Sequence, residues 1–305
     1  MNLRLVSLLT LTVLFTFTSC KKDDQPTTDN KTEVTTHSED QNRVAGDMDG
    51  ITNDVNLAIE TDGSFSGRYM DVQGVCGATV SIDTLSNPRK ITIVYSGANC
   101  FGSHTRTGTV VVSMPAGTRW KNPGTVLTVS YQNVKITRVI DNKSITINGS
   151  HTLTNVSGGL MIHLPNLNQI VHDLNSSGMT ITFDDNTQRS WQVARRRTFT
   201  YSNGVNLAIS GTHSIGNQTG IAEWGTNRFG HSFTTSITQP LVFRQDCALR
   251  MTSGQLKHEG FATVTATFGL DASGNTTSCP GTGHYYYKLD WTGPGGNTQS
   301  VIHPY

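Results

Sequence analysis

Most of the chain after residue 75 follows a two-residue alternation of apolar and polar positions. The alternating segments are rich in Thr, Val and Ile and are separated by Gly, Asn and Asp, which is typical of strands joined by turns. Ten segments show the pattern: 78–83, 90–95, 108–114, 125–136, 144–154, 179–183, 190–201, 205–212, 262–268 and 285–291. The pattern predicts an all-β body built from antiparallel sheet or sandwich-like units in tandem.

The stretch before these strands has two different patterns. Ile51, Val55, Ala58 and Ile59 recur at helical spacing and predict one short amphipathic helix over residues 47–62. Residues 20–46 are mostly polar or charged and offer too little apolar surface to offset the entropy lost on ordering. We therefore expect residues 20–46 to be a lipid anchor followed by a disordered tether.

The amino-terminal segment 1–19 predicts a secretory signal. It carries Arg4 and then an apolar run that is shorter than the roughly 20 residues needed to span a membrane. Cys20 follows directly, after two small polar residues, and this junction resembles a bacterial lipobox, in which the cysteine is acylated and becomes the new amino terminus. An ordinary signal peptide with an incidental cysteine is the alternative.

Three residues after the cysteine bear on its destination. Lys22, Asp23 and Asp24 resemble the lysine-plus-acids export signal of Bacteroidota lipoproteins. The resemblance implies a protein in the outer membrane, anchored by lipid and facing the extracellular side. Several acyl chains on one residue anchor stably, whereas a single chain binds reversibly.

The charge of the chain argues against nucleic acid as a partner. Lys plus Arg number 23 and Asp plus Glu 22, and only 15% of residues are charged. Nucleic-acid binding normally needs a basic patch. In the one basic run, Arg195 and Arg197 share a strand face and Arg196 takes the other, and we expect a solvated strand edge there.

An internal repeat predicts two β units, residues 63–165 and 166–305, which form one domain or two. INGSHTLTNVSG begins at Ile147 and ISGTHSIGNQTG at Ile209, so His151 and His213 occupy equivalent positions. Duplicated positions usually serve duplicated packing, and this is the favoured interpretation. A two-histidine metal site where the repeats meet is the alternative, although no third ligand stands at metal-site spacing.

The four remaining cysteines fall into two local pairs. Cys76 and Cys100 flank one strand-turn-strand segment, and Cys247 and Cys279 flank a second. An antiparallel hairpin brings the residue before its first strand opposite the residue after its second. We therefore predict disulfides between Cys76 and Cys100 and between Cys247 and Cys279, and no zinc site, since closely spaced CxxC pairs are missing.

Several segments together resemble a family of uncharacterised Bacteroidota surface lipoproteins with paired-cysteine β repeats. The segments are CKKDD, CGATVSID, ITIVYSGANC, RTGTVVVSM, CALRMTSGQLKHEG, ATVTATFG and YYYKLDW. The resemblance implies an anchored β protein and carries no known chemistry. The long DASGNTTS insertion before Cys279 departs from the shorter turn of that family.

The sequence contains no complete motif for catalysis or cofactor binding. GSFSG has Phe65 where a serine nucleophile would stand, and His258 and Glu259 lack the second histidine of HExxH. We therefore nominate no catalytic residue, metal or cofactor. DMDGITND from Asp47 has spaced acids like a calcium loop, although acids near a helix start are commonly caps. Thr84 lies in an Asp-Thr-Leu triplet that resembles a Bacteroidota O-glycosylation signal in a turn.

The carboxy-terminal run HYYYKLDW is the most aromatic part of the chain. Alternation puts Tyr285, Tyr287, Leu289 and Trp291 on one face, which we assign mainly to packing. Tyr286 and Trp291 are the candidate glycan contacts. The favoured function is a non-catalytic surface protein that binds a glycan, a surface or an envelope protein, and the alternative is a surface glycan hydrolase or lyase.

Overall fold

The computed structural model describes residues 27–66, 74–260, 262–279, 283–292 and 297–305. The helices are α1 (Thr27–Thr61) and α2 (Gly63–Ser66), with two 3-10 turns, η1 (Met161–Asn166) and η2 (Gln245–Cys247). The strands are β1 (Ala78–Asp83), β2 (Arg89–Ala98), β3 (His104–Met114), β4 (Thr125–Arg138), β5 (Ser144–Asn155), β6 (Ile170–Phe183), β7 (Gln188–Tyr201), β8 (Val205–Gly211), β9 (His213–Ile215), β10 (Gln218–Thr226), β11 (Ser232–Arg244), β12 (Arg250–Glu259), β13 (Thr263–Leu270), β14 (Tyr286–Thr292) and β15 (Thr298–Pro304).

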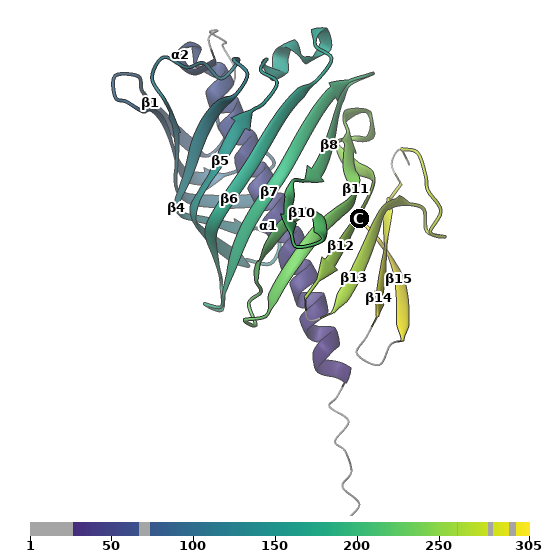
Figure 1. Ribbon diagram of the computed structural model, residues 1–305. Helices are drawn as coiled ribbons and strands as arrows, with labels where there is room; N and C mark the ends of the chain where they lie inside the picture. The colour runs from purple at the N-terminus through teal and green to yellow at the C-terminus, as the bar shows by residue number, and fades with distance from the viewer. Residues whose placement is uncertain (1–26, 67–73, 261, 280–282, 293–296) are drawn as a thin grey trace, which may run out of the picture.

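These strands form one antiparallel sheet that curves around α1 (Figure 1). Strands that follow one another in sequence are mostly neighbours in the sheet, from β1 to β7 and again from β10 to β15. Two strands, β8 and β10, lie between β7 and β11. Strand β10 pairs with the first part of β7, and β8 pairs with its second part. The predicted antiparallel all-β fold with an amino-terminal helix is confirmed.

The two predicted β units share this sheet. The boundary expected at residues 165 and 166 falls between β5 and β6, which pair from Ile145↔Phe183 to Asn155↔His172. A single large hydrophobic cluster also contains Ile91 from the first unit and Phe233 from the second. The repeat therefore does not mark two separate sheets.

Helix α1 begins at Thr27, twenty residues before the predicted start, and has 35 residues. Its second half has the predicted apolar stripe, in which Ile51, Val55, Ala58 and Ile59 are buried against the sheet. Its first half has polar residues on the equivalent positions. Periodicity of apolar residues alone therefore does not detect the first half, which corresponds to much of the predicted tether.

The arginines of β7 correct one prediction. Arg197 is 5% exposed on the inner face of the sheet, and the partly buried Arg195 pairs there with Glu223. Arg196 lies on the outer face and donates two 2.8 Å hydrogen bonds to Asp173. The predicted alternation is right, but the solvated edge is wrong, because β7 is an interior strand with neighbours on both sides.

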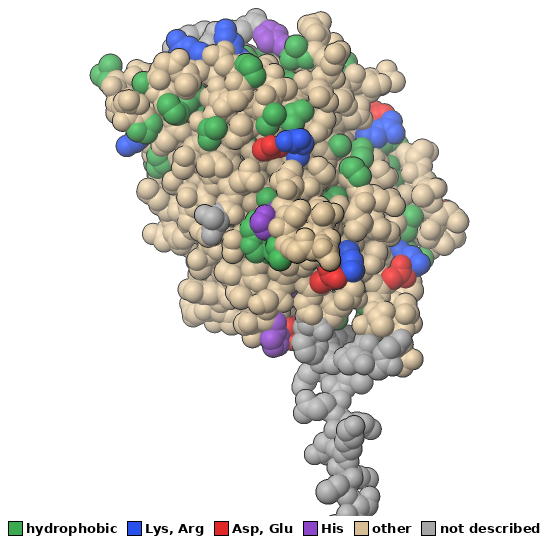
Figure 2. Space-filling model, in the orientation of Figure 1, with side chains coloured by type: hydrophobic (Ala, Val, Ile, Leu, Met, Phe, Trp, Pro, Cys, Tyr) green, Lys and Arg blue, Asp and Glu red, His purple; other side chains and the backbone are tan. Residues whose placement is uncertain are grey.

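On the face of the molecule shown in Figure 2, charged side chains are few and several positive ones lie beside negative ones. Apolar side chains are scattered over this face in small groups. No helix among the described residues is long and apolar enough to cross a membrane.

Candidate functional site

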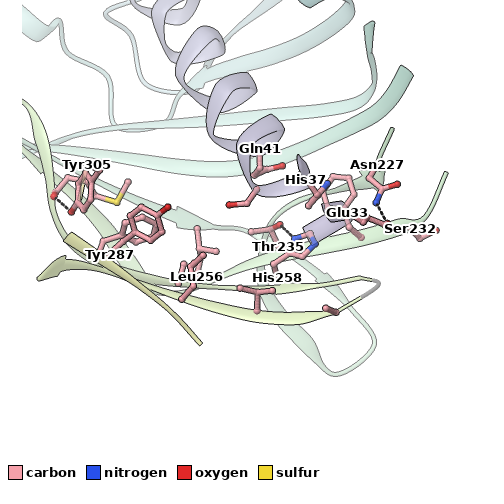
Figure 3. A pocket seen from close by; sticks show the side chains of 18 residues that line it. Glu33, His37, Gln41, Asn227, Ser232, Thr235, Leu256, His258, Tyr287 and Tyr305 are labelled. Atoms are coloured by element: carbon pink, nitrogen blue, oxygen red, sulfur yellow. Dashed lines mark hydrogen bonds between the residues drawn. The ribbon is translucent and has the colours of Figure 1, made fainter. Parts of the chain in front are cut away.

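A cavity of about 330 Å³ lies between the first half of α1 and the inner face of strands β11 to β14. The helix contributes Glu33, His37, Ser38 and Gln41 to its wall. Residues 33, 37 and 41 are four apart and therefore share one helix face. Figure 3 shows His37 and Glu33 near one end of the cavity, with Tyr287 and Tyr305 at the other.

The sheet side of the cavity is apolar because the inner-facing positions of three neighbouring strands are apolar. Leu256 of β12 pairs with Ala266 of β13, which pairs with Leu289 of β14, so these three side chains form a row across the sheet. Val264 and Phe268 flank the row on β13. The helix does not fill the space above them, because its own apolar stripe begins only at Val44.

Two histidines form part of the polar end. The rings of His37 and His258 have centroids 4.4 Å apart, and Phe233 lies 4.9 Å from the first and 5.6 Å from the second. Thr235 Oγ1 is 3.0 Å from His258 Nδ1. Burial, His258 and Arg189 lower the pKa of His37 to about 2, and burial followed by Arg189 lowers the pKa of His258 to about 4. Both rings are therefore neutral at pH 7.

Arg189 lies immediately behind this end of the cavity. Its Nη2 donates to Gln41 Oε1 at 2.8 Å, and its guanidinium carbon lies 4.8 Å from the Phe233 ring centroid. The side chain is 1% exposed, and burial lowers its pKa to about 10, so it keeps its charge at pH 7. Among the residues that the structure describes, Nε and Nη1 have no hydrogen-bond partner.

Hydrogen bonds and the Arg228–Asp40 ion pair attach the helix to the turn between β10 and β11. Glu33 Oε1 accepts from Asn227 at 2.8 Å and lies 2.6 Å from His231 Nδ1. Two turns further along, Asp40 accepts two hydrogen bonds from Arg228. These contacts keep the first half of the helix over the sheet, and Glu33 and Asn227 also line the cavity.

The predicted cysteine pairs are brought together, both with Cα atoms 5.2 Å apart, a separation typical of disulfides. Cys76 and Cys100 flank the β1–β2 hairpin, as expected. Cys247 lies before β12 and Cys279 follows β13, so the long loop does not prevent the second pair from meeting.

The predicted lipid anchor and export signal lie outside the described residues, since Cys20, Lys22, Asp23 and Asp24 precede Thr27. Thr84 is described and lies in the exposed turn between β1 and β2. There the Asp83 carboxylate accepts hydrogen bonds from the backbone of Leu85 and Ser86. O-glycosylation of Thr84 remains a prediction.

The aromatic candidates on β14 do not form one surface. Tyr287 lines the cavity, and Tyr285 is buried, whereas Tyr286 alternates to the other face. Trp291 shares the inward parity with Tyr287 but is only half-buried and is not part of the cavity wall. Tyr286 and Trp291 are thus on opposite faces and cannot hold one sugar together.

The histidines of the repeat are also separated. His151 is 2% exposed and packs against Tyr131, with ring centroids 5.5 Å apart. His213 stacks on Trp224 at 4.1 Å, on the face opposite to the buried Glu223. Among the described residues, no cluster of three or more metal-ligating side chains includes either histidine.

The proposed calcium segment is helical rather than a loop. Asp47 lies 3.6 Å from His104 and 3.9 Å from Arg43, and Asp54 accepts hydrogen bonds from Tyr95 and Arg106. The spaced acids therefore serve contacts between α1 and the sheet.

Sequence reasoning missed the residues at the polar end of the cavity. His37 and Gln41 fell in the predicted tether, and Arg189 just before a predicted strand. One signal existed: Arg189 has the same parity as Trp191 and Val193, which places it on the inner face with them.

Comparison with protein-family models, curated proteins and solved structures finds no match for this chain.

Proposed function

We propose that this protein binds a small apolar molecule in the cavity between α1 and strands β11 to β14, while anchored by lipid at Cys20 to the outer face of the outer membrane. The observation that carries the proposal is the cavity itself. Its volume of about 330 Å³ lies within the range of small-molecule sites. Its walls are mainly apolar, with polar groups gathered at one end, as in sites that bury an apolar ligand and orient it.

The anchor is supported by the sequence, through the apolar segment 1–19, Cys20 and the charged residues behind it. It would keep a ligand-binding body at the cell surface. The resemblance to Bacteroidota surface lipoproteins agrees with this location and adds nothing about the ligand.

The cavity gives little support to the two functions expected from the sequence, glycan binding and glycan cleavage. A glycan platform at Tyr286 and Trp291 would need both side chains on one face. A glycan hydrolase or lyase would need converging carboxylates. Among the described lining residues of the cavity Glu33 is the one carboxylate, and Asn227 and His231 hold it.

The test fills the cavity from its wall. Ala266→Phe places a large ring in the row between Leu256 and Leu289, and Thr265→Phe on the other face of β13 is the matched control. The mature chain carrying Cys20→Ala avoids acyl chains and detergent. We expect the neutral dye N-phenyl-1-naphthylamine to fluoresce strongly with the parent and with Thr265→Phe, but weakly with Ala266→Phe. Equal dye binding by all three would overturn the proposal.

A further inference from the structure

The polar end of the cavity contains more hydrogen-bonding capacity than the described residues use. Nε and Nη1 of Arg189 and both ring nitrogens of His37 lack partners among them. Arg189 is 1% exposed and His37 7% exposed. Buried polar groups are nearly always hydrogen-bonded, and leaving one unpaired is costly. Arg189 lies behind the wall rather than in it, beside the wall residues Gln41 and Phe233, so a polar partner bound at this end of the cavity would complete its hydrogen bonds and those of His37.

Because Arg189 is positively charged, we expect the polar partner at this end of the cavity to be an anion. No carboxylate of the described residues lies within ion-pair distance of it. Asp40 receives two hydrogen bonds from Arg228, and Glu33 is held by His231, so the nearby acids are already engaged. Asp40 raises the pKa of Arg189 from a distance but makes no direct ion pair with it, so a bound anion would supply the direct partner that this buried cation lacks.

The rest of the cavity wall indicates the chemical character of the other end of the ligand. Beyond the polar end, the wall consists of Leu256, Val264, Ala266, Leu289 and other apolar or aromatic residues. Figure 3 shows Leu256 between the histidines and the two tyrosines, Tyr287 and Tyr305. A molecule that occupies the whole space therefore has one anionic end and one apolar end.

We propose that the ligand is a fatty acid, with its carboxylate against His37, Gln41 and Arg189 and its chain along the row of Leu256, Ala266 and Leu289. This inference rests on the proposed function and specifies its ligand class. A carboxylate carries a single charge, which matches one guanidinium. A neutral histidine ring donates one N–H, and a carboxylate accepts several hydrogen bonds, so one carboxylate can accept from His37 and from a free N–H of Arg189.

The first test needs no mutation of the site. Binding of dodecanoate and of 1-dodecanol to the mature Cys20→Ala chain is measured at neutral pH by displacement of N-phenyl-1-naphthylamine. Both have the same chain and differ in the charge of the head. We expect dodecanoate to bind about 10- to 100-fold more tightly, the range of a hydrogen bond to a charged group. Equal affinities would overturn the fatty-acid inference and leave the apolar site standing. Binding of neither molecule would also overturn the proposed function.

Two substitutions then assign the preference to Arg189. Arg189→Met removes the charge, and Gln41→Glu supplies Arg189 with a carboxylate of the protein in place of the ligand's. We expect each variant to lose the preference for dodecanoate over 1-dodecanol. Arg196→Met, on the outer face of the same strand, is the matched control and keeps the preference. If folded Arg189→Met and Gln41→Glu proteins both still prefer dodecanoate, the role of Arg189 is wrong.

Discussion

Arg228 donates two hydrogen bonds to Asp40 across 188 positions of the chain, with its Nε and Nη2 2.7 and 2.6 Å from the two carboxylate oxygens. This bidentate pair joins the first half of α1 to the turn between β10 and β11. The Asp40 carboxyl is 8% exposed, and burial raises its pKa in spite of the arginine. The contact holds in place the helix segment that forms one wall of the cavity.

Arg228→Ala should therefore destabilise the protein substantially, because it leaves a buried carboxylate without its partner. We expect a loss of about 3 to 5 kcal/mol in the free energy of unfolding. Urea denaturation measures the loss, and hydrogen exchange should show faster exchange in the first half of α1. The control is Arg138→Ala, which removes an exposed pair with Asp141 and should cost about 1 kcal/mol or less. Similar losses in the two variants would show that the buried pair does not hold the helix.

The interior histidines should make the protein sensitive to acid. Burial, as the main cause, lowers the pKa of His37 to about 2, of His151 and His172 to about 3, and of His258 to about 4. The unfolded chain, with histidine pKa values near 6.5, binds more protons than the folded chain below that pH. Stability is therefore complete above about pH 6.5 and falls toward pH 4, by about 1.4 kcal/mol per pH unit for each histidine.

His151→Phe tests this dependence at a site away from the cavity, because Phe keeps an aromatic ring beside Tyr131. Urea denaturation at several pH values gives the slope of stability against pH. Between pH 6 and pH 5 we expect the slope of the variant to be lower by about 1.4 kcal/mol per pH unit. An unchanged slope would mean that His151 is already protonated in the folded protein.

The two disulfides should each contribute about 3 kcal/mol, mainly by restricting the unfolded chain. Their sequence separations of 24 and 32 residues predict similar contributions. The measurement compares urea denaturation of the parent with Cys76→Ser/Cys100→Ser and Cys247→Ser/Cys279→Ser. Peptide mapping without reductant checks the pairing, and a Cys76–Cys247 crosslink would contradict it.

Cys20→Ala should release the protein from membranes, because the acyl chains would then have no attachment site. Metabolic labelling with an acyl analogue should mark the parent and not the variant, and an unlabelled parent would refute the anchor. Replacement of Lys22, Asp23 and Asp24 by Ala should preserve labelling. It should reduce the cleavage of this protein when external protease is added to intact cells.

Local patterns in the sequence were sufficient for much of the fold. Period-two alternation identified most of the strands, since the side chains of a strand necessarily alternate between a buried and an exposed face. The hairpin order of the strands also predicted both cysteine pairs, because neighbours in sequence are neighbours in most of the sheet. Ile51, Val55 and Ile59 located the second half of α1 by their helical spacing.

Only the tertiary structure decided the first half of α1 and the candidate site. Glu33 and Asp40 are ordered by partners nearly two hundred residues away, and no local pattern contains that information. The cavity exists because the apolar stripe of the helix stops at Val44 while the apolar face of the sheet continues to β14. Arg189 came to lie behind the cavity wall because its strand lies inside the sheet, where an inward arginine is buried whatever its polarity.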